Sequence, residues 1–323
     1  MKGNFQMIDL HMHTIYSDGE LTPDMVLGLC KKIEIISVTD HNSVGMALNF
    51  AHIAINDKAA ESILKNFIVG TEITIEGYPD LLVYYPHISI QNFNVLQEIE
   101  QKLQVIRVNE ELAVKEAYSN LGFCEWEIDK KGAFPIHTHV TEARTRELAS
   151  ICYGKRTGNI SRGFFETEDL RKARIARRGV IDNHKYIKDN PYVFSKSTLG
   201  ELVLAHPIRT AIKRADKHAD FNRVIRCLYE LVIEFIENDG RIIEWEYLDC
   251  EMNQDFSRYP ALQGHCKSIR EHIKKIIDMY SLKCIWGSDT HIQHPKDYKL
   301  WGELPYLGLT DYLPSWVSIE SFS

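Results

Sequence analysis

The stretch Asp9-Leu10-His11-Met12-His13 decides the fold, because it joins a short apolar strand to two histidines. Residues 7–10 are apolar except for Asp9, which is typical of a short buried strand. Alternate residues of a strand lie on the same face, so His11 and His13 can point toward one ion. Zinc, manganese and iron sites of hydrolases use imidazole ligands. The same pair could also be two hydrogen-bonded core histidines, and the rest of the chain decides between these interpretations.

The pattern of a strand followed by polar side chains recurs along the chain. Four further apolar stretches are each followed by side chains that can bind a metal: 35–39, 67–71, 201–205 and 283–288. Helical patterns separate these stretches, and such alternation predicts an α/β fold with a parallel sheet. In parallel sheets, the residues that follow the strands meet at one end of the fold. The following side chains are therefore expected to form one site: His11, His13, His41, Glu72, His206, Asp289 and His291.

The length of 323 residues suffices for one large α/β domain that carries an insertion. Long helical patterns with many charges occupy residues 89–198. We predict that this segment is a largely helical insertion, a lid or shoulder, in an α/β domain built from residues 1–88 and 199–323. Its part 155–188 is basic, which is typical of a solvated helix face. The alternative is a surface that holds the phosphate of a substrate.

The composition argues against several classes of protein. A net charge of -7 disfavours a protein that coats nucleic acid, and no apolar run has the length of a membrane span. The seven cysteines lie far apart without a Cys-x-x-Cys pair, so they indicate neither a disulfide framework nor a thiolate zinc site. We found no phosphate-binding Gly-rich loop, nucleophile elbow or dinucleotide fingerprint. The first strand leaves no room for a signal sequence, so we expect a cytoplasmic protein.

Five short motifs together resemble the PHP (polymerase and histidinol phosphatase) family of metal-dependent phosphoesterases. They occur in that family's order between residues 8 and 291: Asp9-Leu10-His11-Met12-His13-Thr14 with Ser17-Asp18-Gly19, Thr39-Asp40-His41-Asn42, Gly70-Thr71-Glu72, Leu204-Ala205-His206-Pro207 and Gly287-Ser288-Asp289-Thr290-His291. The resemblance implies a distorted (β/α)7 barrel with two or three divalent ions, manganese, iron or zinc, at its mouth. The similar branch contains small proteins that act on nucleotide phosphates or RNA ends.

The resemblance also implies which side chains hold each ion. His11, His13, Glu72 and Asp289 would bind the first ion, and Glu72 would share the second with His206. The third ion would be held by Asp18, His41 and His291. Carboxylates can bridge two cations, so Glu72 is the expected bridge.

The two aspartates next to expected ligands, Asp9 and Asp40, could orient imidazoles from behind. We assign such a supporting catalytic role to Asp40. Asp9 could equally pair elsewhere in its strand.

The sequence departs from the family pattern at two places. Where the family commonly has a histidine at the start of the fourth strand, this chain has Asp80, whose oxygen would favour manganese over zinc. His87 is a less suitable replacement and is expected on the surface. Related proteins also bring an arginine and a histidine from the insertion over the substrate phosphate. Of four candidates there (His137, His139, Arg144 and Arg162), we select His139 and Arg162.

The expected function is hydrolysis of a nucleotide or oligonucleotide phosphoester by water activated between metal ions. The expected partners are a small phosphorylated substrate or a nucleic-acid end, with no membrane, and a protein partner and the oligomeric state are left open. One alternative is another metal hydrolase of the amidohydrolase type, which also uses His-x-His on the first strand. A second alternative is a metal-stabilised interaction module that partners a separate ATPase or polymerase without turnover.

Overall fold

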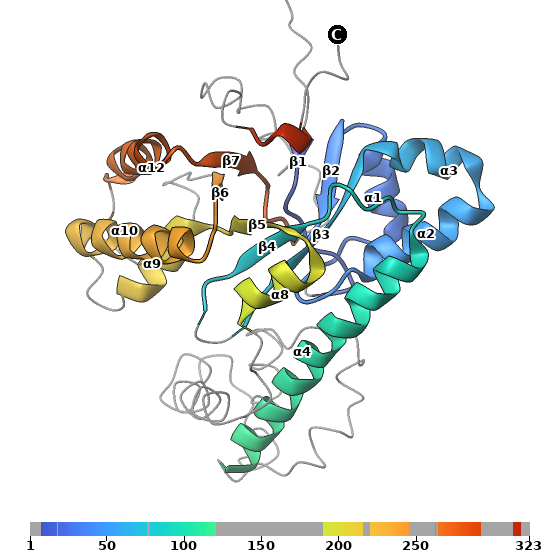
Figure 1. The fold of residues 1–323 in the computed structure, drawn as a ribbon, viewed down its shortest axis with the longest axis horizontal. Helices are drawn as coiled ribbons and strands as arrows, with labels where there is room; N and C mark the ends of the chain where they lie inside the picture. The colour runs from blue at the N-terminus through green and yellow to red at the C-terminus, as the bar shows by residue number, and fades with distance from the viewer. Residues whose placement is uncertain are drawn as a thin grey trace, which may run out of the picture.

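Seven strands form one sheet in which the spatial order follows the chain, from β1 to β7 (Figure 1). The strands are β1 (Ile8–Asp9), β2 (Ile35–Val38), β3 (Phe67–Ile73), β4 (Leu81–Tyr84), β5 (Glu201–Leu204), β6 (Ile242–Trp245) and β7 (Lys283–Trp286). This computed structural model describes residues 8–17, 19–75, 78–120, 190–215, 220–245, 262, 264–291 and 313–317, with the backbone alone for 108–120 and 266. Five of these strands, β1, β2, β3, β5 and β7, overlap the apolar stretches that the sequence analysis selects.

The sheet nearly closes into a barrel, because the chain after β7 returns to the chain after β1. The amide of Leu10 donates to the carbonyl of Trp286 at 3.2 Å, and that of His13 donates to Thr290 at 2.9 Å. Met12 and Thr290 form a parallel bridge between these hydrogen bonds. The predicted α/β barrel-like fold is confirmed.

The direction of β4 corrects the expectation of a parallel sheet. It pairs antiparallel with both β3 and β5, whereas the other neighbouring strands are parallel. Only residues 74–80 connect β3 to β4, which is too few for the crossover helix that a parallel return needs. The start of β4 therefore lies at the same end of the barrel as the carboxyl ends of the other strands. This reversal brings Asp80 to the mouth.

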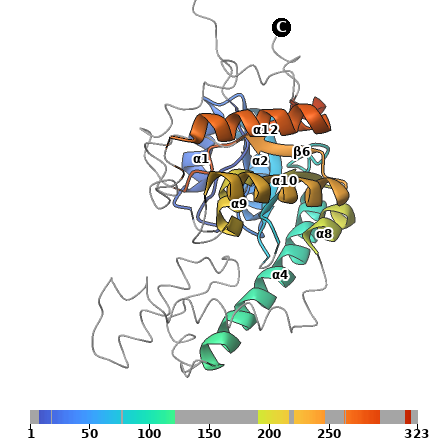
Figure 2. The ribbon, with the colours of Figure 1, turned by 90° about the vertical axis from the view of Figure 1, so that its left-hand side faces the viewer.

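The helices cover the outside of the sheet. In Figure 1, α1, α2 and α3 lie on one side of the strands and α9, α10 and α12 on the other; Figure 2 shows the second group face on. The helical segments are α1 (Pro23–Cys30), α2 (Gly45–Asn56), α3 (Lys58–Ile63), η1 (Leu64–Asn66), α4 (Phe93–Asn120), α8 (Pro191–Thr198), α9 (Pro207–Ala215), α10 (Phe221–Glu237), α12 (Cys266–Tyr280) and η8 (Ser315–Val317).

Local sequence sets where these helices begin. The side chain of Thr22 accepts a hydrogen bond from the amide of Met25, and Pro23 occupies the first helical position of α1. The helical pattern of residues 45–64 predicts one helix. The structure divides it at Asp57, whose carboxylate accepts from the amide of Ala59 at 2.8 Å and so begins α3. Aspartate is among the preferred capping residues, which explains the division.

Two apolar clusters hold the barrel together. The inner cluster is formed by strand residues such as Leu10, Leu82 and Val203, and the outer cluster joins the strands to the helices. The inner cluster is covered by the described part of the C-terminal tail, because Val317 is buried in it and the ring centroids of Trp316 and Tyr84 lie 5.3 Å apart. Residues 313–317 thus pack at the end of the barrel opposite the mouth.

Of the segment 89–198, the structure describes α4, α8 and the residues next to them. The basic stretch 155–188 lies outside the described residues, so the predicted insertion with its lid or shoulder stays a prediction. None of the helices in the described part of the chain combines the length and the apolar character that a membrane crossing needs.

Candidate metal centre

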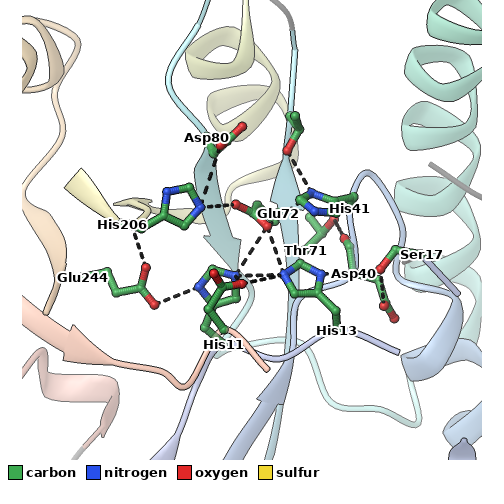
Figure 3. A network of polar contacts seen from close by, with 12 residues as sticks. His11, His13, Ser17, Asp40, His41, Thr71, Glu72, Asp80, His206 and Glu244 are labelled. Atoms are coloured by element: carbon green, nitrogen blue, oxygen red, sulfur yellow. Dashed lines mark hydrogen bonds and ion pairs between the residues drawn. The ribbon is translucent and has the colours of Figure 1, made fainter. Parts of the chain in front are cut away.

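Three groups of ligand-type side chains meet at the mouth of the barrel. Figure 3 shows six of these side chains: His11, His13, His41, Glu72, Asp80 and His206. Within each group, the potential ligand atoms all lie within 4.8 Å of one another. The three groups are His11, His13 and Glu72; Glu72, Asp80 and His206; and His13, His41 and His291. Glu72 belongs to two of them and His13 to two, so the groups form one continuous centre.

The first group lies at the middle of the centre and is fully buried. Nε2 of His11 and Nε2 of His13 are 3.1 Å apart, and both face Oε2 of Glu72, at 3.4 Å and 3.2 Å. Oδ1 of Asp289 lies 3.4 Å from the first of these nitrogens and 3.2 Å from the second. All four side chains expected to bind the first ion are thus in contact.

The other nitrogen of His11 is occupied by Glu244, a residue of β6 that the sequence analysis did not select. Nδ1 of His11 lies 2.8 Å from Oε1 of Glu244, and Oε2 of the same carboxylate accepts the amide hydrogen of His206 at 2.7 Å. A neutral imidazole that donates from Nδ1 has its lone pair on Nε2. Nε2 faces the carboxylates of Glu72 and Asp289, so it would carry either a proton or a metal ion. The donor set therefore fits a divalent metal ion.

The second group extends from Glu72 toward the start of β4. Nε2 of His206 lies 3.0 Å from Oε1 of Glu72 and 3.8 Å from Oδ2 of Asp80. Oε1 of Glu72 thus faces the second group, whereas Oε2 faces the first group and also lies 3.2 Å from Nδ1 of His41. Asp80 occupies the place where a histidine was expected from the family pattern. His87, by contrast, is exposed, as predicted.

The third group is formed by three imidazoles, and the ring of His13 stacks against the other two. The ring centroid of His13 lies 4.5 Å from that of His41 and 4.2 Å from that of His291. Nδ1 of His41 is also 2.9 Å from the hydroxyl of Thr74. Asp18, the third expected ligand of this ion, lies outside the described residues, as do His139 and Arg162.

Asp40 and Asp9 do not bond directly to the imidazoles. The carboxylate of Asp40 accepts hydrogen bonds from the amide and the hydroxyl of Thr14 and from Ser17, at 2.6–2.7 Å. The hydroxyl of Ser17 is in turn 3.4 Å from Nδ1 of His13, so Asp40 reaches that ring through one residue. Asp9 accepts from the amide and hydroxyl of Ser288 and thereby joins β1 to the loop that carries Asp289.

The buried charges shift each other's proton equilibria. Burial lowers the pKa of His11, but Glu244, Asp289 and Glu72 together raise it well above its ordinary value. Burial raises the pKa of Glu72, yet His41 and His11 hold it well below its usual range. The pKa of Asp289 is also held well below its usual range, because Arg209 and His11 outweigh burial. The two carboxylates are thus held ionised, and either a proton or a metal ion on His11 would balance their charge.

Arg209 is the second residue that the sequence analysis missed. It lies in the first turn of α9, and its guanidinium donates to Oδ2 of Asp289, whose other oxygen faces His11 and His13. Its side chain is 35% exposed, so the guanidinium is accessible at the mouth. The sequence signal that could have identified Arg209 was its position three residues after His206, because this spacing places both residues near the start of α9.

The backbone around the centre is unusual for residues with side chains. Asn42, His206 and Asp289 have φ values of 49°, 25° and 49°, in a region that L-residues rarely adopt. Each lies in or next to one of the three groups, and such conformations concentrate at functional sites. A Cβ added at Gly287 would lie 2.1 Å from Cβ of His11, so only glycine allows this close approach.

No family model and no curated protein matches the chain. Among solved structures, the chain is similar to an amidohydrolase from Chromobacterium violaceum with bound sulfate and no metal, at 17% identity and a TM-score of 0.47, over 90% of this chain and 89% of that chain. It is also similar to a protein from Bifidobacterium adolescentis provisionally assigned as a metal-dependent phosphoesterase, at 18% identity and a TM-score of 0.49, over 88% of each chain. Such distant likenesses do not decide an activity.

Proposed function

We propose that the protein is a metal-dependent phosphoesterase of PHP type. The observation that carries this proposal is the position of Glu72, whose two oxygens face two adjacent groups of ligands. Paired ions that share a carboxylate are a common arrangement in enzymes that hydrolyse phosphoesters. The third group, around His41, would hold a further ion beside them.

The proposed ligands are those that the motifs implied. His11, His13, Glu72 and Asp289 would hold the first ion, and Asp80 and His206 would complete the second around Glu72. A divalent ion there supplies a Lewis acid that lowers the pKa of water and neutralises phosphate oxygens. Asp80 contributes a carboxylate where an imidazole was expected, which favours a hard ion such as manganese.

The chain's own residues would orient these ligands and the substrate. Glu244 fixes the ring of His11 and the backbone of His206 at the same time. Asp40 holds Thr14 and Ser17, and through Ser17 the ring of His13. Arg209 would provide a positive charge beside the ions for an oxygen of the substrate phosphate. We assign the substrate class as nucleotides or oligonucleotide ends, with His139 and Arg162 as further phosphate contacts.

The experiment is a hydrolysis screen of the full chain with manganese over aryl phosphates, mononucleotides and short RNA and DNA. The double variant His11→Ala/His13→Ala should abolish turnover. A matched control, His52→Ala/His87→Ala, removes two imidazoles that are exposed in the structure and should leave turnover unchanged. Bound metal together with no hydrolysis of any ester would contradict the proposal. Recovery of a stable protein partner in that case would favour the interaction module.

A further inference from the structure

Helix α4 is attached to the barrel by one face. Four of its residues at helical spacing, Leu96, Ile99, Leu103 and Ile106, are buried in the same apolar cluster as α2 and the strands. Figure 1 shows the helix extending from this contact away from the sheet. The attached part of α4 thus lies beside the turn that connects β2 to α2.

A buried ion pair lies within this contact. Nη2 of Arg107 is 2.6 Å from Oε1 of Glu100, and their side chains are only 2% and 16% exposed. Removing two charges from water costs free energy, which further hydrogen bonds must offset. Those hydrogen bonds go to the turn 42–44: Arg107 donates to the carbonyl of Asn42, and Glu100 accepts from the amide of Val44 at 2.8 Å. Both charges of this ion pair therefore hold one turn.

That turn follows His41 directly and is also attached to the strand that carries Glu72. The amide of Asn42 donates to the carbonyl of Glu72 at 2.7 Å. The side-chain amide of Asn42 donates to the carbonyl of Thr74 and accepts from its amide, at 3.0 Å and 3.2 Å. The left-handed conformation of Asn42, with φ of 49°, lets one residue make all these contacts. His41 is thus placed by a turn that lies between α4 and β3.

We infer that the Glu100–Arg107 pair positions His41 for the ion of the third group, His13, His41 and His291. The two residues contact neither this ion nor a substrate, and act through the backbone of Asn42 and Val44. The inference rests on the proposed metal binding, but on no particular substrate. Through this turn, α4, the first helix of the predicted insertion, would influence one ion of the centre.

The test is a manganese titration of the full chain that measures the number of ions and the affinity of each. The variant His41→Ala should lose one ion, and the ion that it loses is the third. Arg107→Met should weaken that same ion about 10- to 100-fold and leave the other ions unchanged, as is typical of residues that orient ligands. Because this variant leaves Glu100 buried without a counter-ion, the double variant Glu100→Gln/Arg107→Met provides a second, electrically neutral version with the same expected result.

The matched control is Leu103→Ala, which removes packing from the same face of α4 without touching the turn. It should lower the thermal midpoint while all ion affinities stay at the wild-type value. Equal loss of all ions in the Arg107 variants, or a third-ion affinity no weaker than that of Leu103→Ala, would overturn the inference. A wild-type chain that binds no manganese would instead refute the proposed metal binding itself, so the two failures are distinguishable.

Discussion

Glu244 lies 2.8 Å from Nδ1 of His11, while Nε2 of the same ring faces Glu72 and Asp289. The ring is therefore held from one side and presented to the proposed first ion on the other. Carboxylates behind metal-binding histidines fix the tautomer and raise the basicity of the ligand nitrogen. The centre thus depends on a residue 233 positions away along the chain.

Replacing Glu244 by glutamine should weaken binding of the first ion about 10- to 100-fold, because the amide no longer fixes the tautomer of His11. Metal titration of the variant measures this change. Glu234→Gln, which removes a surface carboxylate that pairs with Arg214, is the control and should bind metal like the wild type. Equal affinity in both variants would show that Glu244 has no part in metal binding.

Replacing Asp80 by alanine should lower the number of bound ions by one per chain, because the second group would keep only Glu72 and His206. Metal analysis after gel filtration in manganese gives the count. Asp239→Asn alters an aspartate that forms an exposed pair with Lys196, and should leave the count unchanged. An unchanged count in Asp80→Ala would remove this residue from the ligands.

Replacing Arg209 by glutamine should raise KM for a phosphate ester about tenfold or more, since hydrogen bonds to charged groups contribute about 1.5–3 kcal/mol. The bound metal should stay the same, which separates a substrate contact from a role in holding Asp289. Arg214 lies on the same helix but pairs with Glu234, so Arg214→Gln should keep the wild-type KM. Loss of metal with an unchanged KM would assign Arg209 to Asp289 instead of the substrate.

Two glycine-to-alanine changes should have opposite effects on stability. At Gly287 the new methyl group would meet the backbone nitrogen of His11 at 2.5 Å, so we expect a loss of about 1–3 kcal/mol or more. At Gly28, inside α1, nothing lies within 4 Å, and alanine should stabilise the helix by about 0.5–1 kcal/mol. Urea unfolding of both variants measures the difference. Equal stability of the two would contradict the close approach at Gly287.

The sequence predicted much of the fold because local signals and strand endings are readable along the chain. The alternation of apolar strands with helices indicated an α/β fold, and the family resemblance implied the barrel. The side chains after each strand indicated which residues would share one end of the fold. The break at Asp57 was not predicted, because a capping residue there interrupts a pattern that reads as one continuous helix. The reversal of β4 was missed because the expectation of a parallel sheet ignored how short its connection is.

The supporting residues of the centre were harder to predict, because their roles depend on pairs that only the folded chain forms. Glu244 alternates with Ile243 and Trp245 in β6, which indicates a buried face but does not identify His11 as its partner. The contact of Arg209 with Asp289 likewise joins α9 to the loop after β7. Glu100 and Arg107 resemble ordinary helix charges in the sequence.

The most direct test of the proposed metal centre is the number of divalent ions bound per chain in the wild type and in Glu72→Gln. Glu72 belongs to two of the three groups, so the wild type should bind two or three ions and the variant should keep the one held by His13, His41 and His291. The glutamine preserves the size of the side chain, and circular dichroism would check that the fold is retained. A wild type without bound ions, or the same number of ions in both proteins, would contradict the account.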